Sequence, residues 1–140
     1  MVKKIALVIL EKPNGDIALQ LRDDKPTIAH PNRWALFGGK IEAGEQPKQA
    51  ALREIAEELT IQLEPERLAF LQKFELEPQK EHFLFHYPLE EELQQAQLTE
   101  GQRFQCWQPG EIKNQHLGDH SLVFSHLEMI SWFWQQNDQP

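Results

Sequence analysis

Residues 39–61 of this chain read GKIEAGEQPKQAALREIAEELTI, a glycine-containing segment followed by a run typical of a helix. Glu54 is followed by Glu57 three residues later and by Glu58 four residues later. Because a helix turns about 100° per residue, this spacing places the three acids on one face. Three like charges there repel one another unless a cation joins them, so the stretch indicates divalent metal chemistry.

The helix itself is predicted from Pro47 to about Leu59. Proline suits the first turn of a helix, and the negative charge of Glu45 is favoured near the helix start. The apolar stripe of the helix consists of Ala51, Leu52, Ile55 and Leu59. The acids lie mostly off this stripe, so one helix has room for both burial and metal binding.

The same stretch resembles the Nudix box, in which glycines, acids, an Arg-Glu pair and aliphatic residues recur at fixed spacings. The matching positions are Gly39, Glu45, Arg53, Glu54, Ile55, Glu57, Glu58 and Ile61. Only Thr60 departs, because it stands where the family has glycine. Glycine there usually leaves the helix in a left-handed conformation that a β-branched residue resists, so we expect a rearranged helix exit that shifts Glu57 and Glu58 slightly.

The resemblance implies a metal-dependent Nudix hydrolase. Its metal ligands would be the carboxylates of Glu54, Glu57 and Glu58 with the carbonyl of Gly39, a set of hard oxygens that suits magnesium, or manganese in its place. Arg53 would pair with a neighbouring carboxylate, Glu45 being the first choice. Water would be the nucleophile and Glu54 the first choice of general base. The plainer alternative, a solvated acidic helix face, does not explain the rest of the pattern.

A further metal-binding glutamate is expected at Glu100. MutT-type members of the family carry such a residue in a later loop, and Glu100-Gly101-Gln102, ahead of a predicted strand, resembles that segment. Its competitors for the role are Glu90, Glu91 and Glu92. The alternative for Glu100 is an exposed acid in a turn.

Substrate contacts are expected from residues on both sides of the box. Gly38 and Lys40 belong to the box approach, and Arg22 is a candidate for a phosphate or base contact or else a surface residue. Phe37 stands where many MutT-type proteins have proline and either lines the pocket or packs in the core. Asp119 either accepts hydrogen bonds from a guanine-type base or caps the final helix. The six histidines show no metal-ligand spacing, and none is assigned a role.

Composition limits the partners. The chain has 140 residues, 40% of them hydrophobic, which suits one domain over residues 1–140 with a proper core. Its net charge of −8 disfavours polymeric nucleic acid and anionic membranes, whereas bound metal ions would make a small phosphorylated molecule acceptable. The single Cys106 cannot form an intrachain disulfide, so a reducing cytoplasm is the simplest compartment. We expect a monomer or a homodimer.

Strands are expected at residues 5–10, 17–22, 34–37, 68–76, 81–87 and 103–107, and helices at 47–59, 109–113 and 121–134. The first two strands read as a hairpin, residues 23–32 as a loop, and residues 90–99 as a loop or weak helical turn. This order predicts an α/β fold, which the resemblance sharpens to a mixed sheet sandwiched between helices. The final helix follows apolar spacing from Leu122 to Phe133.

Three classes of function follow from these expectations. The first is a magnesium-dependent hydrolase that cleaves a nucleoside diphosphate derivative, above all a nucleoside triphosphate to monophosphate and pyrophosphate, with oxidised purine nucleotides as candidates. ADP-ribose or a nucleotide sugar is the alternative substrate. A module that senses a nucleotide without hydrolysing it is the rival class, and a structural or interaction role comes third.

Overall fold

The computed structural model describes residues 1–115 and 117–137. The strands are β1 (Lys3–Glu11), β2 (Ile17–Leu21), β3 (Trp34–Ala35), β4 (Phe37–Lys40), β5 (Ala69–Phe74), β6 (Lys80–Pro88) and β7 (Arg103–Trp107). The α-helices are α1 (Pro47–Leu59), α2 (Pro109–Lys113) and α3 (Phe124–Asn137), and single 3₁₀ turns occur at η1 (Pro65–Arg67) and η2 (Glu92–Gln95). No helix among these residues is long and apolar enough to cross a bilayer.

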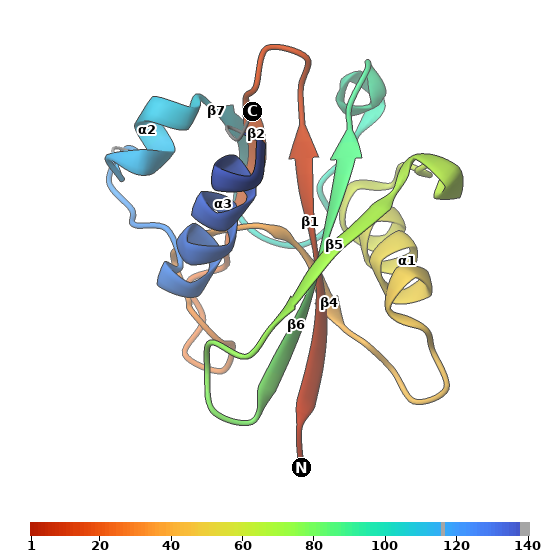
Figure 1. Cartoon of the computed structure of the whole chain (residues 1–140). Coiled ribbons are helices and arrows are strands. Elements are labelled where there is room, and N and C mark those ends of the chain that lie inside the picture. The colour runs from red at the N-terminus through yellow and green to blue at the C-terminus, as the bar shows by residue number, and fades with distance from the viewer. Residues whose placement is uncertain (116, 138–140) are drawn as a thin grey trace.

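The strands form one mixed sheet with β1 at its centre. β1 runs parallel to β6 along its whole length and antiparallel to β4 from Ile5, opposite Lys40, to Val8, opposite Phe37. Helix α1 lies on one side of the sheet and α3 on the other (Figure 1). The predicted α/β fold, a mixed sheet between helices, is thereby confirmed.

The sheet divides beside the first turn. β1 and β2 pair at Glu11 and Ile17, next to that turn, and then separate, β2 continuing with β3 and β7. The expected strand 34–37 is accordingly two strands interrupted at Leu36, because the chain changes partner there from β2 to β1. The N–H of Leu36 is bonded to Nδ1 of His126 (3.1 Å). At Leu36, where the sheet divides, a side chain thus supplies the hydrogen bond that a neighbouring strand would otherwise supply.

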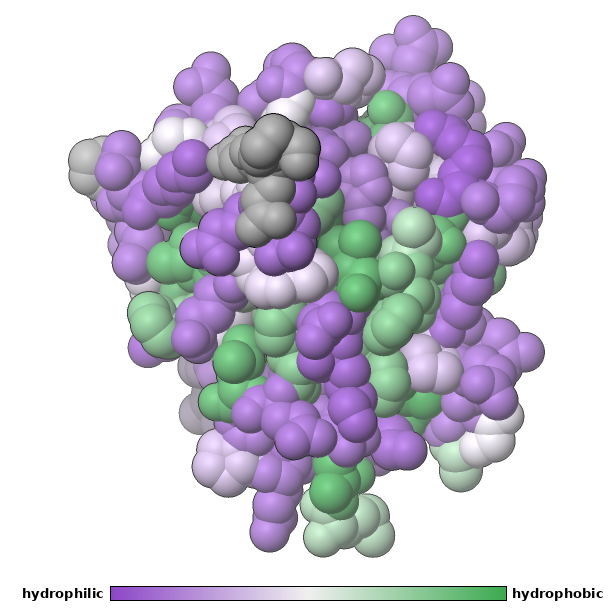
Figure 2. Space-filling model, viewed as in Figure 1, coloured by the Kyte–Doolittle hydropathy of each residue, from purple (hydrophilic) through white to green (hydrophobic). Residues whose placement is uncertain are grey.

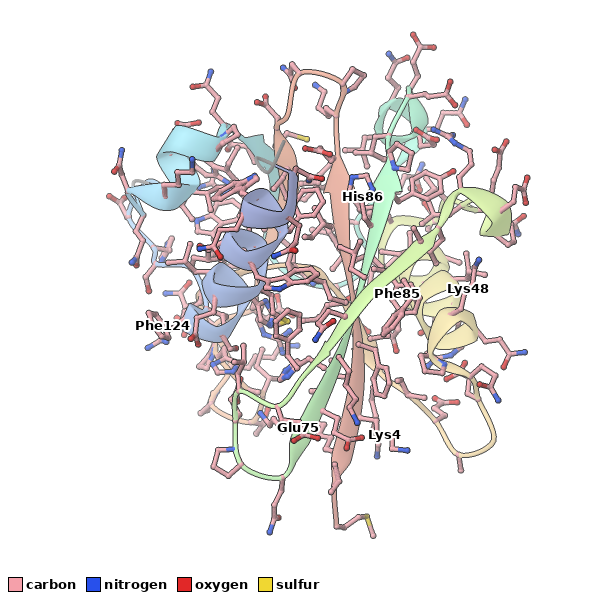
Figure 3. The ribbon with its side chains drawn as sticks, viewed as in Figure 1. Lys4, Lys48, Glu75, Phe85, His86 and Phe124 are labelled. Atoms are coloured by element: carbon pink, nitrogen blue, oxygen red, sulfur yellow. The ribbon has the colours of Figure 1, made fainter. Side chains whose placement is uncertain are left out.

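Each face of the sheet has its own core, as the alternation of a strand requires. On β1, Val8 faces α1 while Leu7 and Ile9 face α3. Phe85 and His86, adjacent on β6, lie on opposite sides of the sheet (Figure 3). Each fully buried aliphatic side chain contributes about 1.5–3 kcal/mol, so the two apolar clusters hold both helices in place.

The chain leaves α1 in a conformation that differs from the expected one. Thr60 adopts the left-handed conformation itself (φ 56°, ψ 32°), so the predicted rearrangement of the helix exit is wrong. The hydroxyl of Thr60 accepts a hydrogen bond from the N–H of Gln97 (3.2 Å), which offsets part of the backbone strain. The helix therefore ends as it would at a glycine.

Helix α3 begins at Phe124, three residues after its expected start at Ser121. The reason is long-range pairing, because the N–H of Trp34 donates to the carbonyl of Ser121 and the N–H of Val123 donates to the carbonyl of Trp34, both at 2.9 Å. These bonds hold the segment extended. Asp119 therefore lies too far before the helix to be its N-cap, and that alternative is wrong.

Much of the surface is polar, but hydrophobic residues gather over β5 in the middle of the face shown in Figure 2. β5 is an edge strand, and its Phe70 is 54% exposed. A register shift between Phe70 and Gln72 interrupts the pairing with β6. Irregular edges of this kind discourage the addition of a further strand.

Candidate active site

A cavity of about 250 Å³ opens where the two parts of the sheet diverge. Seven of the residues predicted from the sequence line it: Arg22, Gly38, Gly39, Lys40, Glu54, Glu58 and Glu100. Its remaining lining includes aliphatic side chains, two further lysines and three histidines. Acidic, cationic and apolar groups therefore meet in one space.

Glu58 is the most deeply placed of the acids, since the residue is 5% exposed. One carboxylate oxygen accepts a hydrogen bond from the N–H of Gly38 (3.0 Å), and the other accepts one from Nε2 of Gln20 (3.3 Å). Burial raises the pKa of Glu58 to about 8, although the hydrogen bond from Gly38 opposes this shift. A buried carboxyl of this kind requires either a proton or a cation near it.

Glu54 fills the space beside Gly39. A Cβ atom built at Gly39 would lie 2.5 Å from Cδ of Glu54, so the carboxylate occupies the position of the missing side chain. Burial raises the pKa of Glu54, opposed by its hydrogen bond with Arg53. Gly38 and Gly39 lie beyond the expected strand 34–37 but belong to β4, and Gly38 is required there because a Cβ would overlap the carbonyl of Ala6.

Arg53 ties the helix to the segment before it. Its guanidinium binds both carboxylate oxygens of Glu45 (2.7 and 3.0 Å) and donates to the carbonyl of Lys40 (2.9 Å) and to Glu54 (2.9 Å). The expected pairing of Arg53 with Glu45 is thus confirmed. The hydrogen bonds from Arg53 lower the pKa of Glu45 to about 2, so this pair is charged at neutral pH.

Glu57 does not join the other two acids. Its side chain is 59% exposed and turned to Arg53, with 3.2 Å between Oε2 and Nη1. Among the described residues, no three His, Cys, Asp or Glu side chains come close enough together to hold a metal ion as they stand. The predicted convergence of Glu54, Glu57 and Glu58 is therefore wrong for this conformation, because Arg53 competes for Glu57.

Glu100 reaches the cavity from the loop that follows η2. That loop is bonded to the end of α1, since the N–H of Gln97 donates to the carbonyl of Leu59 (2.9 Å) and the N–H of Thr99 to that of Glu58 (3.0 Å). The competing acids Glu90 and Glu92 instead lie beside Arg67, and Glu91 is exposed. The oxygen donors available at the cavity are therefore the carboxylates of Glu54, Glu58 and Glu100 and the backbone of β4, which suit a hard divalent cation.

Three histidines line the cavity and were not predicted: His30, His82 and His126. His82 and His126 are 2% and 8% exposed. Burial lowers the pKa of all three, that of His126 to about 3, so they are neutral at pH 7. They come from the loop after β2, from β6 and from α3, and local spacing in the sequence gives no signal for such a cluster.

Two predicted substrate contacts lie elsewhere. The side chain of Phe37 is fully buried on the α1 side, with its ring 6.3 Å from that of Phe104, so the core-packing alternative is correct. Asp119 is exposed and is not part of the cavity lining. Arg22 does line the cavity, and its Nε donates to the carbonyl of Ala29 (2.7 Å).

Comparison with known proteins agrees with this geometry. The family model of the NUDIX domain matches residues 1–133. The 8-oxo-dGTP diphosphatase of Escherichia coli (strain K12) is 34% identical over 88 residues, which is 63% of this chain and 65% of the length of that relative.

Solved structures show the same fold. The MutT protein from Methanosarcina mazei Go1 has a TM-score of 0.77 at 20% identity, covering 99% of this chain and 96% of that one. A bifunctional NMN adenylyltransferase/ADP ribose pyrophosphatase from Francisella tularensis, complexed with AMP and a manganese ion, has a TM-score of 0.75 at 19% identity over 97% of this chain and 42% of that one. Box residues, sheet topology and family match agree: this chain belongs to the Nudix family and is MutT-like among its members.

Proposed function

We propose that the protein is a magnesium-dependent pyrophosphohydrolase that converts a nucleoside triphosphate to the monophosphate and pyrophosphate. The observation that carries this proposal is the placement of Glu54, Glu58 and Glu100 on one cavity whose other charged groups are cations. Small phosphorylated molecules need both features, a metal site and positive charge for the remaining phosphate oxygens. The chain as a whole has a net charge of −8, so the cationic side chains on this cavity stand out against an acidic protein.

The metal ligands in this proposal are the carboxylates of Glu54, Glu58 and Glu100 and the carbonyl of Gly39. Glu57 would complete the set by rotating away from Arg53, whose other contacts with Glu45 and Lys40 remain. Members of the family use divalent metals, and we propose magnesium, with manganese as a substitute. When bound, such an ion neutralises phosphate charge and lowers the pKa of a coordinated water.

The protein groups supply positioning and proton transfer. Arg22, Gly38 and Lys40 lie on the cavity, where the two cationic side chains bind phosphate oxygens. Glu54 takes the proton from the attacking water. The water oxygen bonds to phosphorus as the bond from that phosphorus to the leaving phosphate oxygen breaks, which gives nucleoside monophosphate and pyrophosphate.

The choice of substrate is supported by the relative in Escherichia coli, an 8-oxo-dGTP diphosphatase. An oxidised purine nucleoside triphosphate is therefore our first candidate. The Francisella tularensis structure supports the alternative of ADP-ribose, since that protein is in part an ADP ribose pyrophosphatase and holds AMP and manganese.

A panel of nucleotides tests the proposal. Purified protein is incubated with magnesium and with dGTP, 8-oxo-dGTP, other nucleoside triphosphates, ADP-ribose and nucleotide sugars, and products are separated by anion-exchange chromatography. We expect monophosphate and pyrophosphate from a triphosphate, and no turnover by Glu54→Gln. AMP and ribose 5-phosphate from ADP-ribose would establish the alternative. Binding of nucleotide without turnover of any compound would instead indicate a sensing module.

A further inference from the structure

Strand β2 contains one polar residue, Gln20, among four buried apolar ones. Gln20 is 3% exposed and faces the α1 side of the sheet, in register with Phe104. Burying a carboxamide is unfavourable unless its hydrogen bonds are made inside the protein. The contacts of this side chain therefore account for its presence in the strand.

The amide nitrogen of Gln20 has two acceptors. Nε2 lies 3.3 Å from Oε2 of Glu58 and 3.5 Å from the carbonyl oxygen of Leu36. Leu36 is the residue between β3 and β4, and its carbonyl is thus bonded to a side chain at the division of the sheet. One amide group joins helix α1 to the segment that leads into Gly38 and Gly39.

The amide oxygen of Gln20 faces the loop of Glu100. A Cβ atom built at Gly101 would lie 3.2 Å from Oε1 of Gln20, and Gly101 has the positive φ of +87° that favours glycine. The next residue is fixed to β2, because the N–H of Gln102 donates to the carbonyl of Leu21 (2.8 Å). Gln20 is therefore bonded to two of the three segments that carry the proposed metal ligands, and its amide oxygen lies next to the third.

We propose that Gln20 is a positioning residue for the metal centre, a role that rests on the proposed function. Its neutral amide orients the carboxylate of Glu58 without cancelling the negative charge that a cation requires. Glu54 and Glu57 differ from Glu58 in this respect, because both are paired with the cationic Arg53 (2.9 and 3.2 Å). A donor that carries no charge keeps Glu58 available.

Metal affinity measures this role independently of turnover. Gln20→Met keeps the length of the side chain and removes its hydrogen bonds. Free Mn²⁺ is quantified by electron paramagnetic resonance in titrations of wild type and variant, and kcat and KM are measured with the best substrate of the panel. We expect the Kd for Mn²⁺ to rise about 10-fold and kcat to fall while KM changes little, as is typical when a partner of a metal ligand is lost.

Gln105→Met is the matched control, because Gln105 is exposed on β7 opposite Leu19 and the chemical change is the same. It should leave Mn²⁺ affinity and kcat unchanged. Thermal melts monitor folding. If Gln20→Met does not melt cooperatively, Gln20→Asn replaces it, since this variant keeps a buried amide but withdraws the donor from Glu58, and we expect the same weakening.

The outcomes separate the two proposals. Equal Mn²⁺ affinity in wild type and a folded Gln20 variant, with wild-type turnover intact, overturns the positioning role and leaves the proposed function standing. Loss of thermal stability alone, with unchanged Kd and kcat, shows that Gln20 is merely structural. A wild-type protein that neither binds Mn²⁺ nor hydrolyses the panel overturns both.

Discussion

The carboxylate of Glu54 lies where a side chain at position 39 would have to be, with 2.5 Å between a Cβ built at Gly39 and Cδ of Glu54. Gly38 excludes a side chain for a different reason, because its Cβ would overlap the backbone of β1 at Ala6 and Leu7. Position 39 must therefore be glycine to make room for the carboxylate of the site, whereas position 38 must be glycine for the sheet to form.

Gly39→Ala should impair catalysis more than folding. The group displaced is the end of a flexible side chain, so Glu54 moves and the sheet does not. We expect a loss of stability below about 1 kcal/mol and a fall in kcat of about 10- to 100-fold, the range seen when metal ligands lose their orientation. Urea unfolding and steady-state kinetics check the two values. Unchanged kcat would show that the position of Glu54 is unimportant.

Gly38→Ala should impair folding first. Its φ of 141° is unfavourable for an L side chain, and the overlapping atoms belong to the backbone of β1, which cannot yield without loss of the pairing between β1 and β4. We expect destabilisation of about 3 kcal/mol or more, as for overpacking combined with backbone strain. Urea unfolding measures it. A stability equal to that of Gly39→Ala would contradict the assignment of Gly38 to the fold and Gly39 to the site.

Thr60→Gly should stabilise the protein. The left-handed conformation at Thr60 costs roughly 1–2 kcal/mol that glycine avoids, although the hydrogen bond between the hydroxyl and Gln97 is lost. We expect the melting temperature to rise by about 2–4 °C. Thr60→Ala retains the strain and lacks the hydroxyl, so it should melt below wild type. A Thr60→Gly protein that melts lower than wild type would show that the hydroxyl contributes more than the strain costs.

His126→Asn should reduce the sensitivity of the protein to acid. The folded-state pKa of His126 is lowered to about 3 by burial, against an ordinary value of 6.5. The stabilisation is therefore complete above about pH 6.5, and as pH falls toward 3 the unfolded chain gains a proton that the folded one does not, costing up to about 1.4 kcal/mol per pH unit. Asn keeps an acceptor for the N–H of Leu36 and does not titrate.

The measurement is the free energy of unfolding between pH 7 and pH 4. The slope should be smaller for His126→Asn than for wild type, whereas His126→Ala, which leaves the N–H of Leu36 without its acceptor, should be less stable at every pH. Parallel curves for wild type and His126→Asn would show that this histidine does not take part in the acid transition.

Glu58→Gln should remove turnover without removing the fold. The buried carboxyl is costly to ionise, and Gln keeps an acceptor for the N–H of Gly38, so stability should be equal or higher. Chelation by EDTA should abolish wild-type activity and added Mg²⁺ should restore it. Mg²⁺ should also raise the melting temperature of wild type and not of the variant, because an ion bound to the folded state alone stabilises it. Retained activity in Glu58→Gln would exclude this residue as a ligand.

Propensities of neighbouring residues predicted those helices and strands whose first or last residues are distinctive in the sequence. Helix α1 begins at Pro47 and ends at Leu59 as expected, and β7 and α2 match their predicted ranges, since Pro109 opens α2. In each case a proline or an alternating apolar pattern sets the limit within a few residues of sequence.

Long-range contacts explain what local rules missed. The break at Leu36 follows from a change of strand partner, and the late start of α3 follows from pairing with Trp34. Helical spacing put Glu57 on the face of Glu58 but did not include the competition from Arg53. The cavity histidines come from segments that only the fold brings together.

The division of the sheet at Leu36 also has an evolutionary consequence. The proposed reactive carboxylates are carried by α1 and the loop bonded to its end, whereas the histidines project from the loop after β2, from β6 and from α3. Because the two sets come from different segments, a replacement among the histidines alters the lining of the cavity without changing the segments that carry the acids. The same fold can therefore vary one part of the cavity lining while it keeps the other.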